Sequence, residues 1–132
     1  MANAMVPELA VRDWRASLAF YRDVLGFTLV YDRPLDGFAF LELGAAQLMI
    51  DQIGIGRTFG EPDLLSESKL GLGINLQIRV DRINPLLDRL ARAGIALYLP
   101  SEERRYVVSD KTVVQRQFVV ADPDGYLLRF CE

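Results

Sequence analysis

Histidine does not occur in this sequence of 132 residues, and cysteine occurs once, at Cys131. Without histidine the usual zinc sites, Ser-His-Asp triads and Cys-His dyads cannot be built, and a single cysteine forms no intramolecular disulfide. Metal sites made only of oxygen ligands and acid–base chemistry by carboxylates remain open. We expect Cys131, one residue from the end, to be a thiol in a frayed strand with no base to activate it.

Long apolar runs and blocks of like charge are also missing. No apolar stretch approaches the roughly 18 residues of a membrane-spanning helix. Residues 1–9 lack the basic and apolar regions of a secretory signal. Lys and Arg number 15 against 18 Asp and Glu, and the resulting net charge of −3 gives no electrostatic footprint for nucleic acid. We therefore expect a cytoplasmic protein with neither nucleic acid nor membrane as a partner.

An internal repeat is present. Val11 and Val80 each close an alternating, strand-like stretch, and Gly26 and Gly94 each follow a helical stretch. The first pair lies 69 positions apart and the second pair 68. This near-constant offset through strand, helix and glycine predicts two copies of one unit.

Each copy has the same order of expected elements. The first helical stretch places Trp14, Leu18, Tyr21 and Leu25 on one face, with Asp13 as its N-cap. The second starts at Asn84-Pro85, read as N-cap and first helical residue. Strands are expected at 27–33, 38–43 and 47–53 after the first helix, and at 95–99, 113–121 and 126–131 after the second.

The sequence therefore predicts an α+β fold of two βαβββ modules, covering about 5–53 and 72–132. The modules form curved mixed sheets with a concave cleft, and each helix lies on the convex side. We expect one domain, in which the Gly-rich segment 54–71 joins the modules.

Strand alternation separates the side chains facing the helices from those on the opposite face. The opposite face collects Val6, Glu8, Met49, Asp51, Asn75, Gln77 and Arg129. A solvated outer face is the commoner explanation of such a set. The mixture of apolar and convergent polar groups also suits a ligand pocket.

Three stretches resemble the vicinal oxygen chelate superfamily, which includes glyoxalase I, extradiol dioxygenases, fosfomycin-resistance enzymes and bleomycin-resistance proteins. They are Val-Arg-Asp at 11–13, Phe-Tyr-x-x-x-Leu-Gly-Phe at 20–27 and the stretch with Asp-Pro-x-Gly at 118–126. In the enzymes of this superfamily, four strand positions bind a divalent metal. Those positions correspond here to Val6, Met49, Asn75 and Arg129, of which only Asn75 offers an oxygen. The resemblance thus implies a member without metal or other cofactor.

Within the superfamily, Val6-Pro7-Glu8-Leu9 and Arg116-Gln117-Phe118 are most similar to bleomycin-resistance proteins. Those proteins are dimers that sequester a cationic glycopeptide antibiotic in clefts between subunits without transforming it. The resemblance implies a homodimer that binds a cationic, partly aromatic small molecule. The expected ligand-binding residues are Glu8, Phe38, Phe40, Met49, Asp51, Asn75, Gln77, Tyr106, Arg116 and Arg129, none of them catalytic. Several members carry Trp-Gly before the arginine where this chain has Val114-Gln115, so stacking would come from Phe38, Phe40, Phe59 or Tyr106.

Two other interpretations remain open. One is a glyoxalase- or dioxygenase-like enzyme with an atypical, His-free site, in which Glu8 or Asp51 would be the general acid or base and Arg129 the electrophile. A weaker alternative is a ligand-sensing or purely structural dimer. Saturable binding without turnover would distinguish a binding protein from the enzyme.

Overall fold

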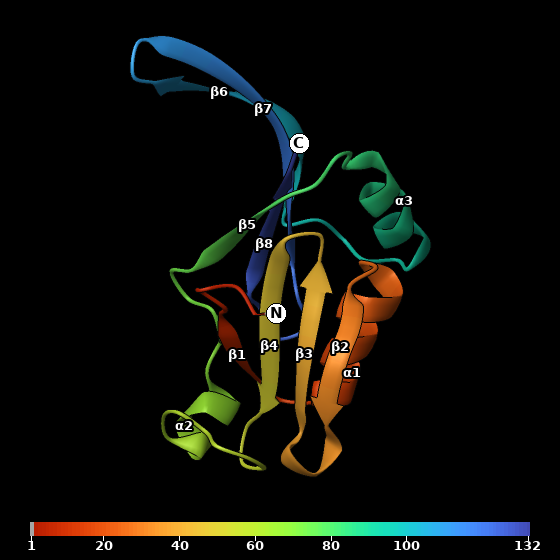
Figure 1. Ribbon diagram of the computed structural model, residues 1–132, viewed down its shortest axis with the longest axis vertical. Coiled ribbons are helices and arrows are strands. Elements are labelled where there is room, and N and C mark those ends of the chain that lie inside the picture. The colour runs from red at the N-terminus through yellow and green to blue at the C-terminus, as the bar shows by residue number, and fades with distance from the viewer. Residues whose placement is uncertain (1) are drawn as a thin grey trace.

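The computed structural model describes residues 2–132 and contains two four-stranded sheets, one above the other along the long axis (Figure 1). We call them the N-sheet, with strand order β1-β4-β3-β2, and the C-sheet, with order β5-β8-β7-β6. β1 runs parallel to β4 and β5 parallel to β8, and the other neighbouring strands are antiparallel. Both sheets are thus mixed, and the predicted α+β fold of two βαβββ units is confirmed.

The elements of the first unit are β1 (Glu8–Val11), α1 (Trp14–Leu18), the π-helical turn η1 (Ala19–Val24), β2 (Thr28–Arg33), the 3₁₀ turn η2 (Pro34–Asp36), β3 (Phe38–Leu43) and β4 (Ala46–Gln52). Those of the second are β5 (Asn75–Arg79), α3 (Asn84–Arg92), β6 (Leu99–Val108), β7 (Lys111–Ala121) and β8 (Leu127–Cys131). Between the units, within the Gly-rich segment 54–71, lies the short helix α2 (Pro62–Glu67), for which the sequence predicted no element. Pro62 begins this helix, where its missing N–H is tolerated.

Helices α1 and α3 lie on the same side of the molecule, and the core fills the space between them and the sheets (Figure 1). One cluster of buried side chains includes Leu9 and Ile50 from the first unit and Phe118 and Phe130 from the second. Neither α1 nor α3 covers the opposite faces of the sheets, which we call the helix-free faces. At the edge of the helix-free face of the N-sheet, Leu65 of α2 lies beside Glu8 and Asp51. Within residues 2–132, no helix is long and apolar enough to cross a membrane.

The first helix confirms the predicted cap and buried face. The Asp13 carboxylate accepts hydrogen bonds from the N–H groups of Arg15 and Ala16 at 3.1 and 3.2 Å. Beyond Leu18, however, the helix widens into a π-turn, in which the N–H of Leu25 donates to the carbonyl of Phe20 at 3.1 Å. This wider turn is compatible with burial of the adjacent side chains of Phe20 and Tyr21.

The two most specific motifs of the sequence meet in the interior. The Tyr21 hydroxyl donates to the Asp122 carboxylate at 2.7 Å, and Asp122 also accepts the N–H groups of Asp124 and Tyr126 at 2.9 Å each. Arg12 pairs with Asp124 at 3.2 Å. Burial raises the pKa of both Tyr21 and Asp122. The Asp-Pro-Asp-Gly turn of the second unit is thus tied to the first helix of the chain.

Three local predictions in the second unit are wrong. Ile83, rather than Asn84, is the N-cap of α3, because the Asn84 side chain instead accepts a hydrogen bond from Arg116 at 2.9 Å. The strand expected at 95–99 begins only at Leu99 and continues to Val108, forming with β7 a hairpin that projects beyond the body (Figure 1). Cys131 is fully buried rather than frayed, because β8 lies between β5 and β7.

Candidate functional site

Five of the expected ligand-binding residues lie on the helix-free face of the N-sheet. In the strand register, Met49 of β4 lies between Glu8 of β1 and Phe40 of β3. Asp51 of β4 lies opposite Phe38 in the next row. Their sequence neighbours point into the core, as strand alternation requires.

Strand β2 adds Tyr31 and Arg33 to this face, although the sequence reasoning did not select either residue. Tyr31 pairs with Phe40 and Arg33 with Phe38. The rings of Tyr31 and Phe40 are stacked, with centroids 5.3 Å apart and an interplanar angle of 17°. The Arg33 guanidinium carbon lies 3.8 Å from the Phe38 ring centroid, within the range of a cation–π contact. The face therefore holds three aromatic rings and a resident cation.

Asp51 is the most buried carboxylate of this face, with 8 % of its surface exposed. Its pKa is raised to about 6, first by burial and then by the charge of the adjacent Glu8 carboxylate and a hydrogen bond with it. The positive charge of Arg33 opposes this effect. Asp51 therefore keeps its proton to a higher pH than an isolated carboxylate does.

A cavity of about 500 Å³ opens beside this pair, a volume suited to a small organic ligand. Its lining consists of Glu8, Arg33, Asp36, Phe38, Asp51, Gly56, Arg57 and Phe59. The segment after β4 thus forms one wall. A side chain at position 56 would place its Cβ 2.9 Å from the Asp36 carbonyl oxygen, so glycine permits this close approach.

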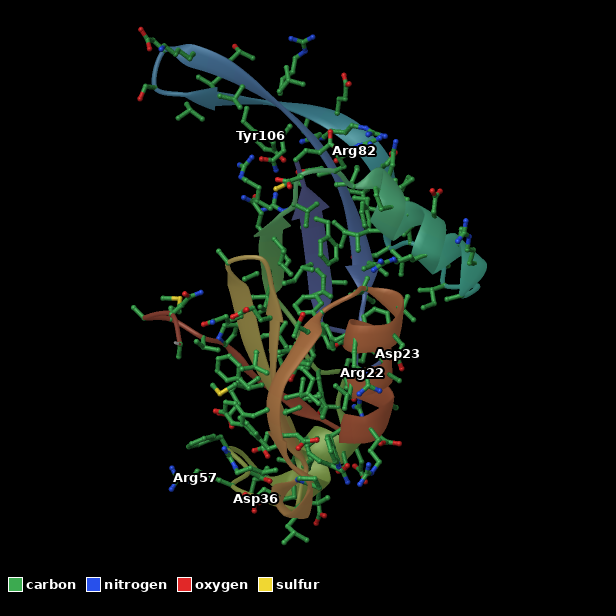
Figure 2. All side chains as sticks on the ribbon, turned by 45° about the vertical axis from the view of Figure 1, so that its right-hand side comes forward. Arg22, Asp23, Asp36, Arg57, Arg82 and Tyr106 are labelled. Atoms are coloured by element: carbon green, nitrogen blue, oxygen red, sulfur yellow. The ribbon has the colours of Figure 1, made fainter. Side chains whose placement is uncertain are left out.

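The C-sheet carries a second cavity, of about 390 Å³, which shares no lining residue with the first. Asn75, Tyr106 and Arg129 of the expected set line it. Figure 2 shows Tyr106 toward the hairpin end of the molecule and Asp36 and Arg57 toward the other. Gln77, on the neighbouring strand, lies opposite Arg129 in the register.

Amide hydrogen bonds organise this second cavity. The Gln117 side-chain oxygen accepts from the Tyr106 hydroxyl at 3.2 Å and from Gln115 at 2.9 Å, and its nitrogen donates to Glu102 at 3.1 Å. The Nε of Arg129 is buried and has no hydrogen-bond partner among residues 2–132. It is an unpaired buried donor in a residue that lines the cavity.

Arg116 lines neither of these two cavities. Its side chain bonds to Asn84 of α3 at 2.9 Å and lies 3.6 Å from the Glu132 carboxylate. The ten expected residues thus divide into five on the N-sheet, four on the C-sheet and Arg116 on the helix side.

The four positions that correspond to metal ligands do not fit a divalent metal. Met49 lies on the N-sheet, Asn75 and Arg129 lie on the C-sheet, and Val6 precedes β1 and has no donor atom. A thioether, an amide and a guanidinium are poor ligands for a hard cation. Across residues 2–132, no group of three His, Cys, Asp or Glu side chains is arranged to hold a metal ion.

Comparison with known proteins agrees with this architecture. Residues 4–130 match the family model described as the Glyoxalase/Bleomycin resistance protein/Dioxygenase superfamily. The chain belongs to this superfamily.

Among members of the superfamily, the chain is 31 % identical over 130 residues to the bleomycin resistance proteins of Geobacillus stearothermophilus and Staphylococcus aureus. Each alignment covers 95 % of this chain and 92 % of the relative. Among solved structures, a virulence protein from Salmonella typhimurium matches with a TM-score of 0.70 at 22 % identity, covering 99 % of this chain and 97 % of the other. TioX from Micromonospora sp. ML1 matches with a TM-score of 0.70 at 24 % identity, covering 99 % and 98 %. These two structures share the fold.

Proposed function

We propose that this protein binds a cationic, partly aromatic small molecule and releases it unchanged, with bleomycin-type antibiotics as the leading candidates. The binding clefts lie between two copies of the chain. No metal or cofactor takes part, and the protein acts in the cytoplasm. The relatives named bleomycin resistance protein support the ligand class.

The observation that carries the proposal is the composition of the N-sheet face. Tyr31 and Phe38 offer ring surfaces that attract a cation by about 0.5–2 kcal/mol, and the buried Phe40 ring stacks against Tyr31. Glu8 and Asp51 lie on the same face and supply negative charge once Asp51 loses its proton. Aromatic walls beside carboxylates are the chemistry that an organic cation with flat groups requires.

A second copy is part of the proposal because the β6–β7 hairpin exposes apolar side chains. Val107 is 77 % exposed, and Val108, Val113 and Val114 are also exposed. Exposed apolar groups on a projecting hairpin favour burial against a partner. We propose a two-fold pair in which the C-sheet cavity of one copy faces the N-sheet cavity of the other, so that Arg129 and the carboxylates line one cleft.

Titration calorimetry with metal-free bleomycin tests the ligand. We expect two sites per dimer, and weaker binding after Glu8→Gln, which removes a charge while keeping the shape of the side chain. Asp32→Asn, an exposed change on the same sheet, is the matched control. Absence of binding at high micromolar ligand would reject the drug assignment. Sedimentation as a species of 14.9 kDa at micromolar concentration would reject the dimer.

A catalytic role is the second candidate, and the Glu8–Asp51 pair is the observation that favours it. A carboxyl with a pKa of about 6 is suited to proton transfer near neutral pH. Arg129, the expected electrophile, lines the cavity of the other sheet, so this reaction also requires a second copy. Recovery of altered ligand after long incubation with the protein, abolished by Asp51→Asn, would favour the enzyme over the binding protein.

A further inference from the structure

Arg33 already occupies the aromatic surface to which the proposed function assigns the ligand. Its guanidinium lies over Phe38 at 3.8 Å and 5.9 Å from the centre of the Tyr31 ring. This is the position that a ligand cation would take in order to contact the same rings and approach Asp51.

The contacts that hold Arg33 in this position are weak. Its Nε lies 3.2 Å from the Asp36 carboxylate, three residues along the chain. Both side chains are about half exposed, at 52 and 55 %, and an ion pair so exposed contributes little. The guanidinium can therefore leave the ring at small cost when a competing cation arrives.

The surroundings of the ring favour replacement by another cation. Glu8, Asp36 and Asp51 line the same cavity as Phe38, so the negative charge that Arg33 balances would remain after it leaves. Arg57 is the other arginine of this lining. A neutral ligand would gain the ring surface but would leave these carboxylates without their counter-charge.

We propose that Arg33 is a specificity-determining residue: it occupies the cation subsite on Phe38, and a ligand binds there by displacing it with a cation of its own. This inference rests on the proposed function, because it assigns one part of the ligand to one subsite. It selects ligands with a flat, cationic group and disfavours neutral analogues of the same shape. Arg33 acts as a built-in competitor for the site.

Two small probes of similar shape test the subsite without a large drug: benzamidinium, which is cationic, and benzamide, which is neutral. Binding is followed by NMR titration of the whole protein. We expect Arg33→Gln to bind benzamidinium about fivefold more tightly than the unmodified protein, with benzamide affinity changed less than about twofold. In the unmodified protein, the Arg33 Nε–H resonance should move as benzamidinium saturates, because the guanidinium leaves the ring current of Phe38.

Arg57→Gln is the matched control, because it removes the same charge from the same cavity without vacating the ring. Its gain in benzamidinium affinity should be clearly smaller than that of Arg33→Gln. Phe38→Leu in the Arg33→Gln background should abolish the gain, since the vacated ring is then missing. Equal gains in the two arginine variants would overturn the proposal, as would an unmoved Arg33 resonance at saturation or failure of Arg33→Gln to bind benzamidinium.

Bleomycin titrations on the same variants separate this inference from the proposed function. If bleomycin binds neither the unmodified protein nor Arg33→Gln while benzamidinium shows the expected gain, the drug assignment fails and the role of Arg33 stands. If bleomycin binds both with equal affinity and benzamidinium shows no gain, the drug assignment stands and the role of Arg33 fails.

Discussion

The helix-free faces of the N-sheet and the C-sheet occupy equivalent places in two units with the same strand order, but they are filled differently. The N-sheet face combines three aromatic rings with a buried carboxylate and a resident arginine. The C-sheet face has a chain of amide hydrogen bonds through Gln117 and continues into a projecting hairpin. One strand order thus supports one face suited to charge and ring contacts and another suited to hydrogen bonding.

The same difference extends to how much of each face one chain buries. Phe38, Phe40 and Asp51 are buried within the single chain, although they point away from helix α1. On the C-sheet face, Val108 and Val113 of the hairpin remain exposed. Substitutions on the N-sheet face should therefore affect both stability and binding, whereas hairpin substitutions should act mainly on association.

The largest expected effect is that of Phe40→Ala. Removing this buried ring leaves a cavity beneath Tyr31, and we expect a loss of about 3 kcal/mol in the free energy of unfolding. Urea unfolding measures the change, and ligand affinity should fall with it. Phe40→Leu keeps most of the apolar volume and should lose much less. A loss below about 1 kcal/mol for Phe40→Ala would mean that this face is no better packed than the hairpin.

Asp51→Asn tests the buried charge through its pH dependence. The pKa of Asp51 is about 6 in the folded protein, above the ordinary 3.8, so the folded state binds this proton more tightly than the unfolded state. The stability contributed by the protonated form is therefore lost as the pH rises toward and through 6. We expect Asp51→Asn to stabilise the protein by about 1–3 kcal/mol at pH 8 and to lose this advantage below pH 4.

Urea unfolding of Asp51→Asn at pH 4, 6 and 8 measures this dependence. Asp32→Asn, at an exposed position of β2, serves as the control for a generic change of net charge. A stability difference for Asp51→Asn that does not vary with pH would contradict the assignment of the buried proton to this side chain.

Gln117→Ala addresses the amide network of the C-sheet. Gln117 is buried, and its removal leaves Tyr106, Gln115 and Glu102 without their shared partner. We expect a loss of about 1–2 kcal/mol in unfolding free energy, smaller than that of Phe40→Ala because the surrounding groups are partly hydrated. A loss equal to that of Phe40→Ala would remove the contrast between the two faces.

Tyr106→Phe should give the smallest effect. It deletes one hydrogen bond of 3.2 Å at a half-buried position, and we expect a loss of about 0.5 kcal/mol or less. Thermal unfolding of the variant beside the unmodified protein measures it. If Tyr106→Phe instead weakens ligand binding tenfold while stability is unchanged, the hydroxyl contacts the ligand and the second cavity is part of the binding site.

Strand alternation was sufficient to place Glu8, Met49 and Asp51 on one face, because β1 and β4 are regular and their register contains no shift. Alternation could not predict that Tyr31 and Arg33 lie on the same face. In a regular strand Tyr31 would share the face of Leu29, which packs against the core. A shift in register between Leu29 and Tyr31 turns the rest of β2 over, so that Tyr31 lies beside Phe40.

In the second unit, too, local periodicity predicted the buried and exposed faces of regular elements but not the pairing of distant strands. The helical period predicts a buried stripe of Ile83, Leu86 or Leu87, and Leu90, and in the structure Leu86 is buried whereas Leu87 is half-buried. The alternation of β5 likewise placed Asn75 and Gln77 on the outer face, where both are exposed. The hairpin could not be assigned from the sequence, because the run of two Glu followed by two Arg at 102–105 is equally typical of a solvated loop. Pairing of Glu103 with Arg116 and of Arg105 with Val114 depends on the partner strand, a long-range contact that the local pattern does not contain.

Tyr21 and Asp122 lie 101 positions apart, in different copies of the repeated unit. A change at Asp122 alone would leave the buried Tyr21 hydroxyl without its partner, and a change at Tyr21 alone would leave Oδ2 of Asp122 without one. Drift at either position is therefore penalised unless both change together. After a gene duplication the two copies can normally change independently. Here, the hydrogen bond between Tyr21 and Asp122 makes substitutions in one copy depend on the residue present in the other. A chimera that takes its first repeat from one family member and its second from another should fold well only when the donors supply a matching hydroxyl and carboxylate.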